Sequence, residues 1–146
     1  MLIPHDTTIL VVDGSHMQVL RNRGTDAAPD LELLKEQTMR NPPTRAMGTS
    51  APGRSFGSAV PKRSAYQNSD LHQRREDRFG HAALQAIASL NREDAPLILI
   101  APPHMLGTLR SELDPKRHAQ ILAEIAKDFA QRDAPDILAL LRSYQP

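Results

Sequence analysis

The sequence predicts a single α/β domain in which helices pack against a mixed sheet. Three observations lead to this prediction: a β-branched run from Thr7 to Val12, an amphipathic helix from about Asp70 to Leu90, and a continuous apolar run from Pro96 to Pro103. A chain of 146 residues can form one core, and a hydrophobic content of 40% is ordinary for a globular protein. We therefore expect one domain over residues 1–146.

The first elements are expected to be antiparallel strands. The run TTILVV is followed by Asp13-Gly14, a pair typical of turns. A second apolar run, Met17 to Leu20, follows after four residues, and this connection is too short for a parallel crossover. The spacing from Asp30 to Thr38 fits a strand or a helix, and we interpret it as a third strand.

A long basic loop is expected between the third strand and the first helix. Residues 40–68 have few apolar side chains and are interrupted by proline and glycine, which indicates a flexible loop. From Arg40 to His81, basic residues outnumber acidic ones, so any attraction for phosphate is local. The basic residues are Arg40, Arg45, Arg54, Lys62, Arg63, Arg74, Arg75 and Arg78, and the acidic ones are Asp70, Glu76 and Asp77.

The second half alternates helices with strands. Phe79, Ala83, Ile87 and Leu90 recur at helical spacing, which places one apolar face on the 70–90 helix. PLILIAPP predicts a central strand, and PHMLGTLRSEL predicts a helix that begins at Pro103 and stops at Asp114-Pro115. The spacing of AQILAEIAKDF fits either a strand or a helix, and APDILALLRSY predicts a short closing helix.

Several kinds of chemistry find no support in the sequence. The chain has no cysteine, no two histidines have the helical spacing of a zinc pair, and no serine lies in a Gly-x-Ser-x-Gly elbow. The GRSFG stretch lacks the Lys-Ser/Thr ending of a phosphate loop, so no ATP, NAD or other cofactor is expected. The amino-terminal residues resemble neither a signal peptide nor a membrane span, which favours a cytoplasmic protein without membrane insertion.

Asp13 and His72 are two further acid–base side chains. Asp13 follows the first strand, where a carboxylate can bind a metal, but metal-dependent phosphoryl chemistry needs several carboxylates and the neighbouring strands carry none. We therefore favour a turn role for Asp13 over a metal role. His72 shares the Phe79 face of the helix, and we interpret it as a histidine at the edge of the core.

The basic cluster is the best candidate for a binding site. On a helix, Arg74, Arg78 and His81 share a stripe opposite Phe79, while Arg75 flanks the apolar face. With loop residues they can meet a phosphate backbone, while Phe56 or Tyr66 stacks on a base. The alternative is a merely solvated charged face. The RNA-binding candidates are Arg54, Lys62, Arg63, Arg74, Arg75 and Arg78.

Several motifs resemble the bacterial host attachment protein family. They are LVVDGSHMQVL, PGRSFGSAV, DLHQRREDRFGHAAL, LILIAPPHMLGTLRSEL and AEIAKDF, and they cover almost the whole chain in order. That family is distantly similar to the middle domain of archaeal and eukaryotic peptide-chain release factors and of Pelota. The resemblance implies a ribonuclease-H-like sheet with three antiparallel strands first, and it favours strands at Leu31 to Thr38 and Gln120 to Ile125.

The resemblance also implies a function. Release factors carry a Gly-Gly-Gln tip on the loop before the long helix, which directs water at the peptidyl-tRNA ester. This sequence has no Gly-Gly-Gln; Gln67, after Tyr66, is nearest by position but lacks the paired glycines. The resemblance therefore favours a non-catalytic domain that binds the ribosome or transfer RNA. The alternatives are a protein-interaction factor that supports attachment through residues 40–68, and a peptidyl-tRNA esterase that uses Gln67.

Overall fold

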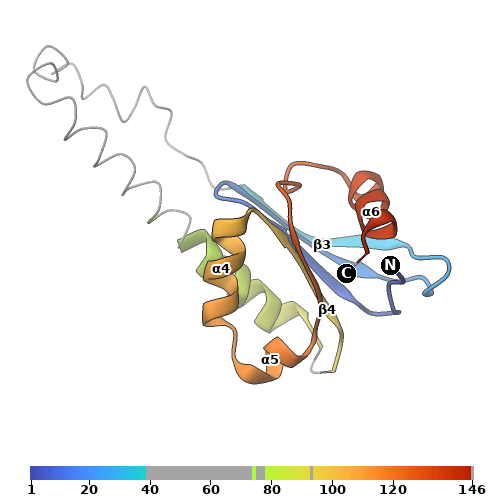
Figure 1. The fold of residues 1–146 in the computed structure, drawn as a ribbon, viewed down its shortest axis with the longest axis horizontal. Helices are drawn as coiled ribbons and strands as arrows, with labels where there is room; N and C mark the ends of the chain where they lie inside the picture. The colour runs from blue at the N-terminus through green and yellow to red at the C-terminus, as the bar shows by residue number, and fades with distance from the viewer. Residues whose placement is uncertain (39–73, 75–77, 93, 146) are drawn as a thin grey trace, which may run out of the picture.

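The fold is an α/β arrangement built on one five-stranded mixed sheet (Figure 1). The computed structural model describes residues 1–38, 74, 78–92 and 94–145. Across the sheet the strands lie in the order β3-β2-β1-β4-β5. Their bounds are β1 Thr8–Val12, β2 His16–Asn22, β3 Leu31–Thr38, β4 Leu97–Ala101 and β5 Ile121–Ala126.

The first three strands are antiparallel neighbours, as predicted. β1 and β2 form a hairpin in which Val12 lies opposite Met17, and β3 pairs with the other side of β2. The strand interpretation of residues 31–38 is therefore confirmed. A register shift between Val19 and Leu20 turns Leu34 toward one core, while most of β3, at the edge of the sheet, stays exposed.

The remaining strands run parallel to β1. β4 lies between β1 and β5 and is buried along its whole length, which confirms the prediction of a covered central strand. The spacing of AQILAEIAKDF fits a strand or a helix, and in the structure residues 121–126 form the strand β5. Its backbone pairs with β4, and Ala123 and Ile125 are buried on one face. A helix here would leave the second edge of β4 without backbone partners.

The helices after β4 begin where proline and aspartate place them. α4 (Pro103–Glu112) starts at the predicted proline, and α6 (Ala134–Ser143) is the expected closing helix, capped by Asp133. Between them lies a short helix that the sequence analysis did not separate, α5 (Pro115–Ala119). Asp114 caps α5, because its side chain accepts a hydrogen bond of 2.7 Å from the Arg117 nitrogen. No helix in the described part of the chain has the length and apolar character to cross a membrane.

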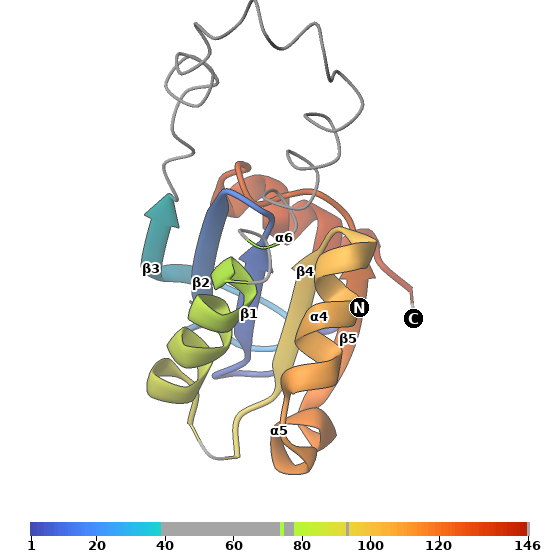
Figure 2. The same ribbon diagram turned by 90° about the vertical axis from the view of Figure 1, so that its left-hand side faces the viewer.

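The sheet separates two hydrophobic cores. One contains Phe79, Ala83 and Ile87 of the helix over residues 78–90, which packs with α4 on one face of the sheet (Figure 2). The other lies beneath α6, where Ile137 and Leu141 meet the opposite face. Residue 74 is also helical, so the described part of the predicted 70–90 helix is confirmed; residues 70–73 and 75–77 lie outside the described residues.

Candidate functional site

One end of the sheet, which we call the carboxyl edge, carries Asp13, a candidate that the structure describes. The parallel strands β1, β4 and β5 all end there, and ligands of open α/β sheets bind at such carboxyl ends. β3 also ends at this edge, because its last residue, Thr38, pairs with His16 at the start of β2. Figure 2 shows the end of β3 and the start of the 78–90 helix on the same side of the molecule.

Asp13 closes the turn between β1 and β2. Its Oδ1 accepts hydrogen bonds of 2.7 Å from the Ser15 nitrogen and 2.6 Å from the His16 nitrogen, and its own nitrogen donates to His16 oxygen at 2.9 Å. Asp13 is only 7% exposed. The predicted turn role is confirmed, and it uses the carboxylate as an acceptor for backbone hydrogens.

A second carboxylate lies against Asp13, contrary to the expectation that none is well placed. Asp128 follows β5 by two residues, and its carboxyl lies near that of Asp13. Partial burial raises the pKa of the Asp128 carboxyl, the neighbouring Asp13 carboxylate raises it further, and His16 lowers it. The strand interpretation of residues 121–126 would have predicted this proximity, because the carboxyl ends of parallel strands lie at the same end of a sheet.

The expectation that Asp13 does not bind a metal stays a prediction. The described ranges hold no group of three or more His, Cys, Asp or Glu side chains arranged for a metal ion. Magnesium and calcium take about six or more oxygen ligands, and two adjacent carboxylates supply only part of such a set. Ligands from residues 39–73 would lie outside the described residues.

Ser15 and His16 meet beside the carboxylate pair. Ser15 Oγ lies 2.9 Å from His16 Nδ1 and donates to Asp13 Oδ1 at 3.2 Å. Adjacent positions in the turn bring them together. Asp13 holds the backbone nitrogen of His16 in this arrangement, whereas in a catalytic triad the carboxylate orients the imidazole ring.

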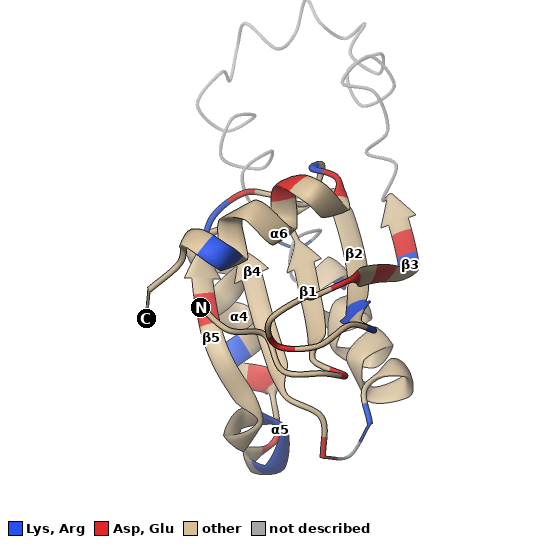
Figure 3. Ribbon diagram, turned by 90° about the vertical axis from the view of Figure 1, so that its right-hand side faces the viewer, with Lys and Arg blue, Asp and Glu red and all other residues tan. Residues whose placement is uncertain are grey.

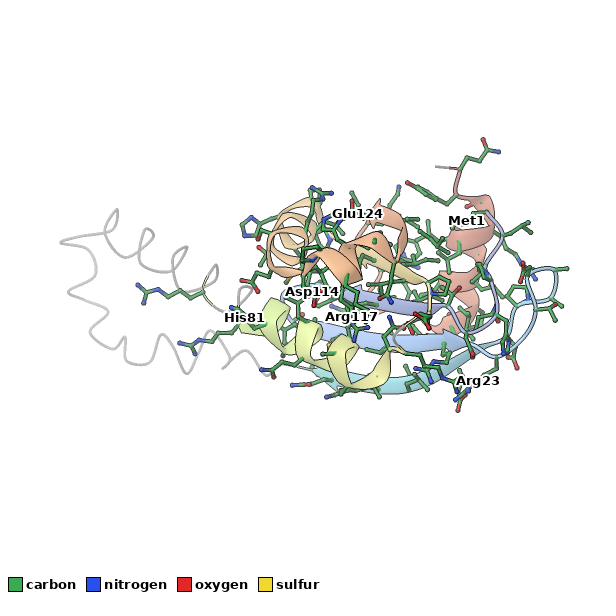
Figure 4. The ribbon with its side chains drawn as sticks, turned by 90° about the horizontal axis from the view of Figure 1, so that it is seen from below. Met1, Arg23, His81, Asp114, Arg117 and Glu124 are labelled. Atoms are coloured by element: carbon green, nitrogen blue, oxygen red, sulfur yellow. The ribbon has the colours of Figure 1, made fainter. Side chains whose placement is uncertain are left out.

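The basic stripe of the helix is exposed where the structure describes it. Arg74 and Arg78 are exposed, and the neighbouring Phe79 is fully buried. His81 also points outward, with 63% of its side chain exposed, and its Nδ1 lies 3.0 Å from Glu112 (Figure 4). The stripe therefore faces solvent as predicted, whereas its contact with RNA stays a prediction.

The other candidates cannot be placed in this geometry. The predicted flexible loop at residues 40–68 lies outside the described residues, as do the remaining RNA-binding and catalytic candidates. These are Arg54, Phe56, Lys62, Arg63, Tyr66, Gln67, His72 and Arg75.

At the opposite end of the sheet, where β4 and β5 begin, lies an open cleft of about 410 Å³ that the sequence did not predict. Asp94, Lys116 and Gln120 are its polar lining residues, and the last two are engaged in further interactions. On the α6 face, acidic and basic residues are interspersed (Figure 3). Neither surface has the one-sided positive charge that favours a phosphate backbone.

Comparison with known proteins identifies the family. Residues 6–141 match the model of bacterial archaeo-eukaryotic release factor family 12. None of the curated proteins compared with the chain matches it. The release-factor side of the resemblance is thus confirmed, while the name of the matched family does not mention attachment to host cells. Because the match spans nearly the whole chain, the protein belongs to bacterial archaeo-eukaryotic release factor family 12.

Proposed function

We propose that this protein is a non-catalytic, cytoplasmic release-factor-like domain that binds ribosomal or transfer RNA at the carboxyl edge of its sheet. Family membership is the observation that carries the proposal, because release factors work on the ribosome at the ester of peptidyl-tRNA. In the same proposal the mixed sheet is ribonuclease-H-like, and residues 40–68 form a flexible basic loop that begins beside this edge.

Charge and exposure at this edge support the proposal. Arg74 and Arg78 are exposed one helical turn apart, next to a fully buried Phe79 that anchors the start of the described helix. The end of β3 lies on the same side of the fold as the start of this helix. The proposal therefore assigns the basic residues that follow β3 and those of the helix to one surface. The RNA-binding set is Arg54, Lys62, Arg63, Arg74, Arg75 and Arg78.

The proposal is non-catalytic because the residues that direct water in release factors have no full equivalent. Gln67 lacks the two preceding glycines, and only glycine adopts the full range of backbone angles that such a tip requires. An esterase would depend on Gln67 alone. If purified protein released peptide from peptidyl-tRNA and Gln67→Ala abolished this activity, the non-catalytic assignment would be wrong.

Sedimentation tests the binding itself. Tagged protein in a lysate is centrifuged through sucrose gradients at low and high salt, and its position is compared with that of ribosomal particles. We expect co-migration at low salt that is lost at high salt. For purified transfer RNA, contact by all six basic residues gives a slope of about −4 to −5 in log affinity against log salt concentration.

Two results would oppose the proposal. A complete absence of RNA and ribosome binding at low salt would contradict it. Recovery of defined proteins without ribosomes would favour the alternative, a protein-interaction factor that binds its partner through residues 40–68 and supports attachment indirectly.

A further inference from the structure

The segment between β5 and α6 crosses the carboxyl edge of the sheet. Residues 127–133 leave the edge strand β5 and lead to α6, which packs near β3 at the other side of the sheet (Figure 1). We call this segment the strap. Ala130 in the strap is only 1% exposed, so the segment lies against the fold at its midpoint.

Gln18 of β2 fixes the backbone of the second half of the strap. Its Nε2 donates to the backbone oxygens of Ala130 at 2.8 Å and of Arg132 at 2.6 Å, and Gln18 is 6% exposed. The Arg132 nitrogen also donates to the Phe129 oxygen at 3.0 Å. Both backbone polar groups of Arg132 therefore have partners inside the fold, and the point from which its side chain extends is fixed.

The side chains of Phe129 and Arg132 pack on each other. Phe129 is partly buried against the core beneath α6, and the guanidinium carbon of Arg132 lies over its ring, 5.5 Å from the centroid. This distance is within the range of about 6 Å for a cation–π contact. Arg132 Nη1 lies 3.7 Å from Asp136 Oδ2, and 61% of the Arg132 side chain is exposed. The surface of the guanidinium group that is turned away from Phe129 is therefore accessible.

We propose that Arg132, positioned by Phe129, is a stacking site for one unpaired RNA base. A guanidinium group is planar and stacks on the faces of aromatic rings and bases, and every base offers such a face. The site suits a base better than a phosphate, because the strap has no excess of positive charge. Its charged residues are Lys127 and Arg132 against Asp128 and Asp133.

The position of Arg132 relative to the sheet suits this role. Gln18, which binds the Arg132 oxygen, is paired with Glu36 near the end of β3. Arg132 thus lies at the carboxyl edge on the α6 side, whereas Arg78 belongs to the helix that packs on the other face. RNA that meets the helix arginines with its phosphates can place a base over the strap. The inference rests on the proposed RNA binding and adds a base contact to it.

Two matched oligomers test the proposal. Oligouridylate and an abasic ribose–phosphate oligomer of the same length carry the same backbone charge, and only the first has bases. Their dissociation constants are measured at low salt for the unmodified protein, Arg132→Lys and Phe129→Leu. Lysine keeps the charge without the planar group, and leucine keeps an apolar side chain against the core without the ring.

We expect the unmodified protein to bind oligouridylate at least about fivefold more tightly than the abasic oligomer. Both variants should lose most of this preference and bind the abasic oligomer as the unmodified protein does. Arg142→Lys is the matched control, because it makes the same change at an exposed arginine in the last turn of α6, and it should keep the preference.

The outcomes separate this site from RNA binding in general. An unchanged preference in Arg132→Lys, or an equal loss in Arg142→Lys, would overturn the stacking site while RNA binding itself stands. Failure of the unmodified protein to bind either oligomer or transfer RNA at low salt would overturn the proposed function and this inference with it. Because Arg132 is exposed, Arg132→Lys should keep the urea-unfolding midpoint of the unmodified protein, so its result decides the test even if Phe129→Leu is unstable.

Discussion

The guanidinium group of Arg21, on β2, donates a hydrogen bond to the backbone oxygen of Leu90, the last residue of the 78–90 helix. Arg21 is 8% exposed. Its positive charge therefore lies under a helix carboxyl terminus, where backbone carbonyls lack partners and the helix dipole is negative. This contact joins the end of the helix to the sheet and so helps to fix the direction in which the helix presents Arg78.

Replacing Arg21 should destabilise the fold. Arg21→Met removes a charged hydrogen bond and leaves a partly buried helix-end carbonyl without a donor, and we expect a loss of about 2–3 kcal/mol in the free energy of unfolding. Arg23→Met is the control, because Arg23 pairs with Glu32 at the surface and should cost less than about 1 kcal/mol. Urea unfolding measures both, and equal losses would contradict the capping role.

Asn22, the last residue of β2, should be the polar residue on which the 23–30 connection depends most. Its fully buried side chain donates to Ile3 oxygen at 2.8 Å and accepts from the nitrogens of Gly24 and Asp30 at 2.9 and 2.8 Å. Asn22→Ala leaves these groups unpaired, and we expect the free energy of unfolding to fall by about 3 kcal/mol. Thermal or urea unfolding measures this loss. A cost below that of a typical exposed substitution would show that water replaces the amide.

Asp128→Asn should change stability in a pH-dependent way. Because the pKa of Asp128 is raised in the folded protein, the folded protein binds the carboxyl proton of Asp128 more tightly than the unfolded chain does. The resulting stabilisation is present below the ordinary aspartate pKa of about 3.9 and is lost as pH rises through the folded value. Asp128→Asn should therefore be more stable than the unmodified protein at pH 7, and nearly equal at pH 3.

The size of this effect is limited by solvent, since Asp128 is exposed, and we expect less than about 1 kcal/mol. Urea unfolding at pH 3, 5 and 7 measures it, with Asp26→Asn as the charge control. A variant that is less stable than the unmodified protein at pH 7 would show that the charged carboxylate is favourable in the folded state.

Arg78 should contribute to RNA affinity through charge alone. Arg78→Ala is expected to weaken transfer RNA binding and to reduce the magnitude of the salt slope by about 0.7 to 0.9, the contribution of one phosphate contact. Arg142→Ala, which removes an exposed arginine from α6 on the opposite face of the sheet, is the matched control. Equal losses in the two variants would indicate nonspecific attraction by net charge.

Local patterns in the sequence were sufficient for most elements. The β-branched run before Asp13-Gly14, the prolines around β4 and the apolar spacing from Phe79 to Leu90 each depend on neighbouring residues, and the structure confirms what they predict. The motifs likewise led to the release-factor relationship that the family match confirms. The exposed arginines of the helix follow from the same spacing, since a residue opposite a buried phenylalanine faces solvent.

Tertiary structure alone decided what lies beside what. Spacing allowed residues 121–126 to be a helix or a strand; pairing with β4 makes them a strand, and this places Asp128 against Asp13, more than 100 positions away in the sequence. Arg21 likewise contacts Leu90 only because the 78–90 helix packs on the face of the sheet that includes β2. Such contacts arise from long-range backbone pairing and burial, whereas a sequence pattern records only which residues are near one another along the chain.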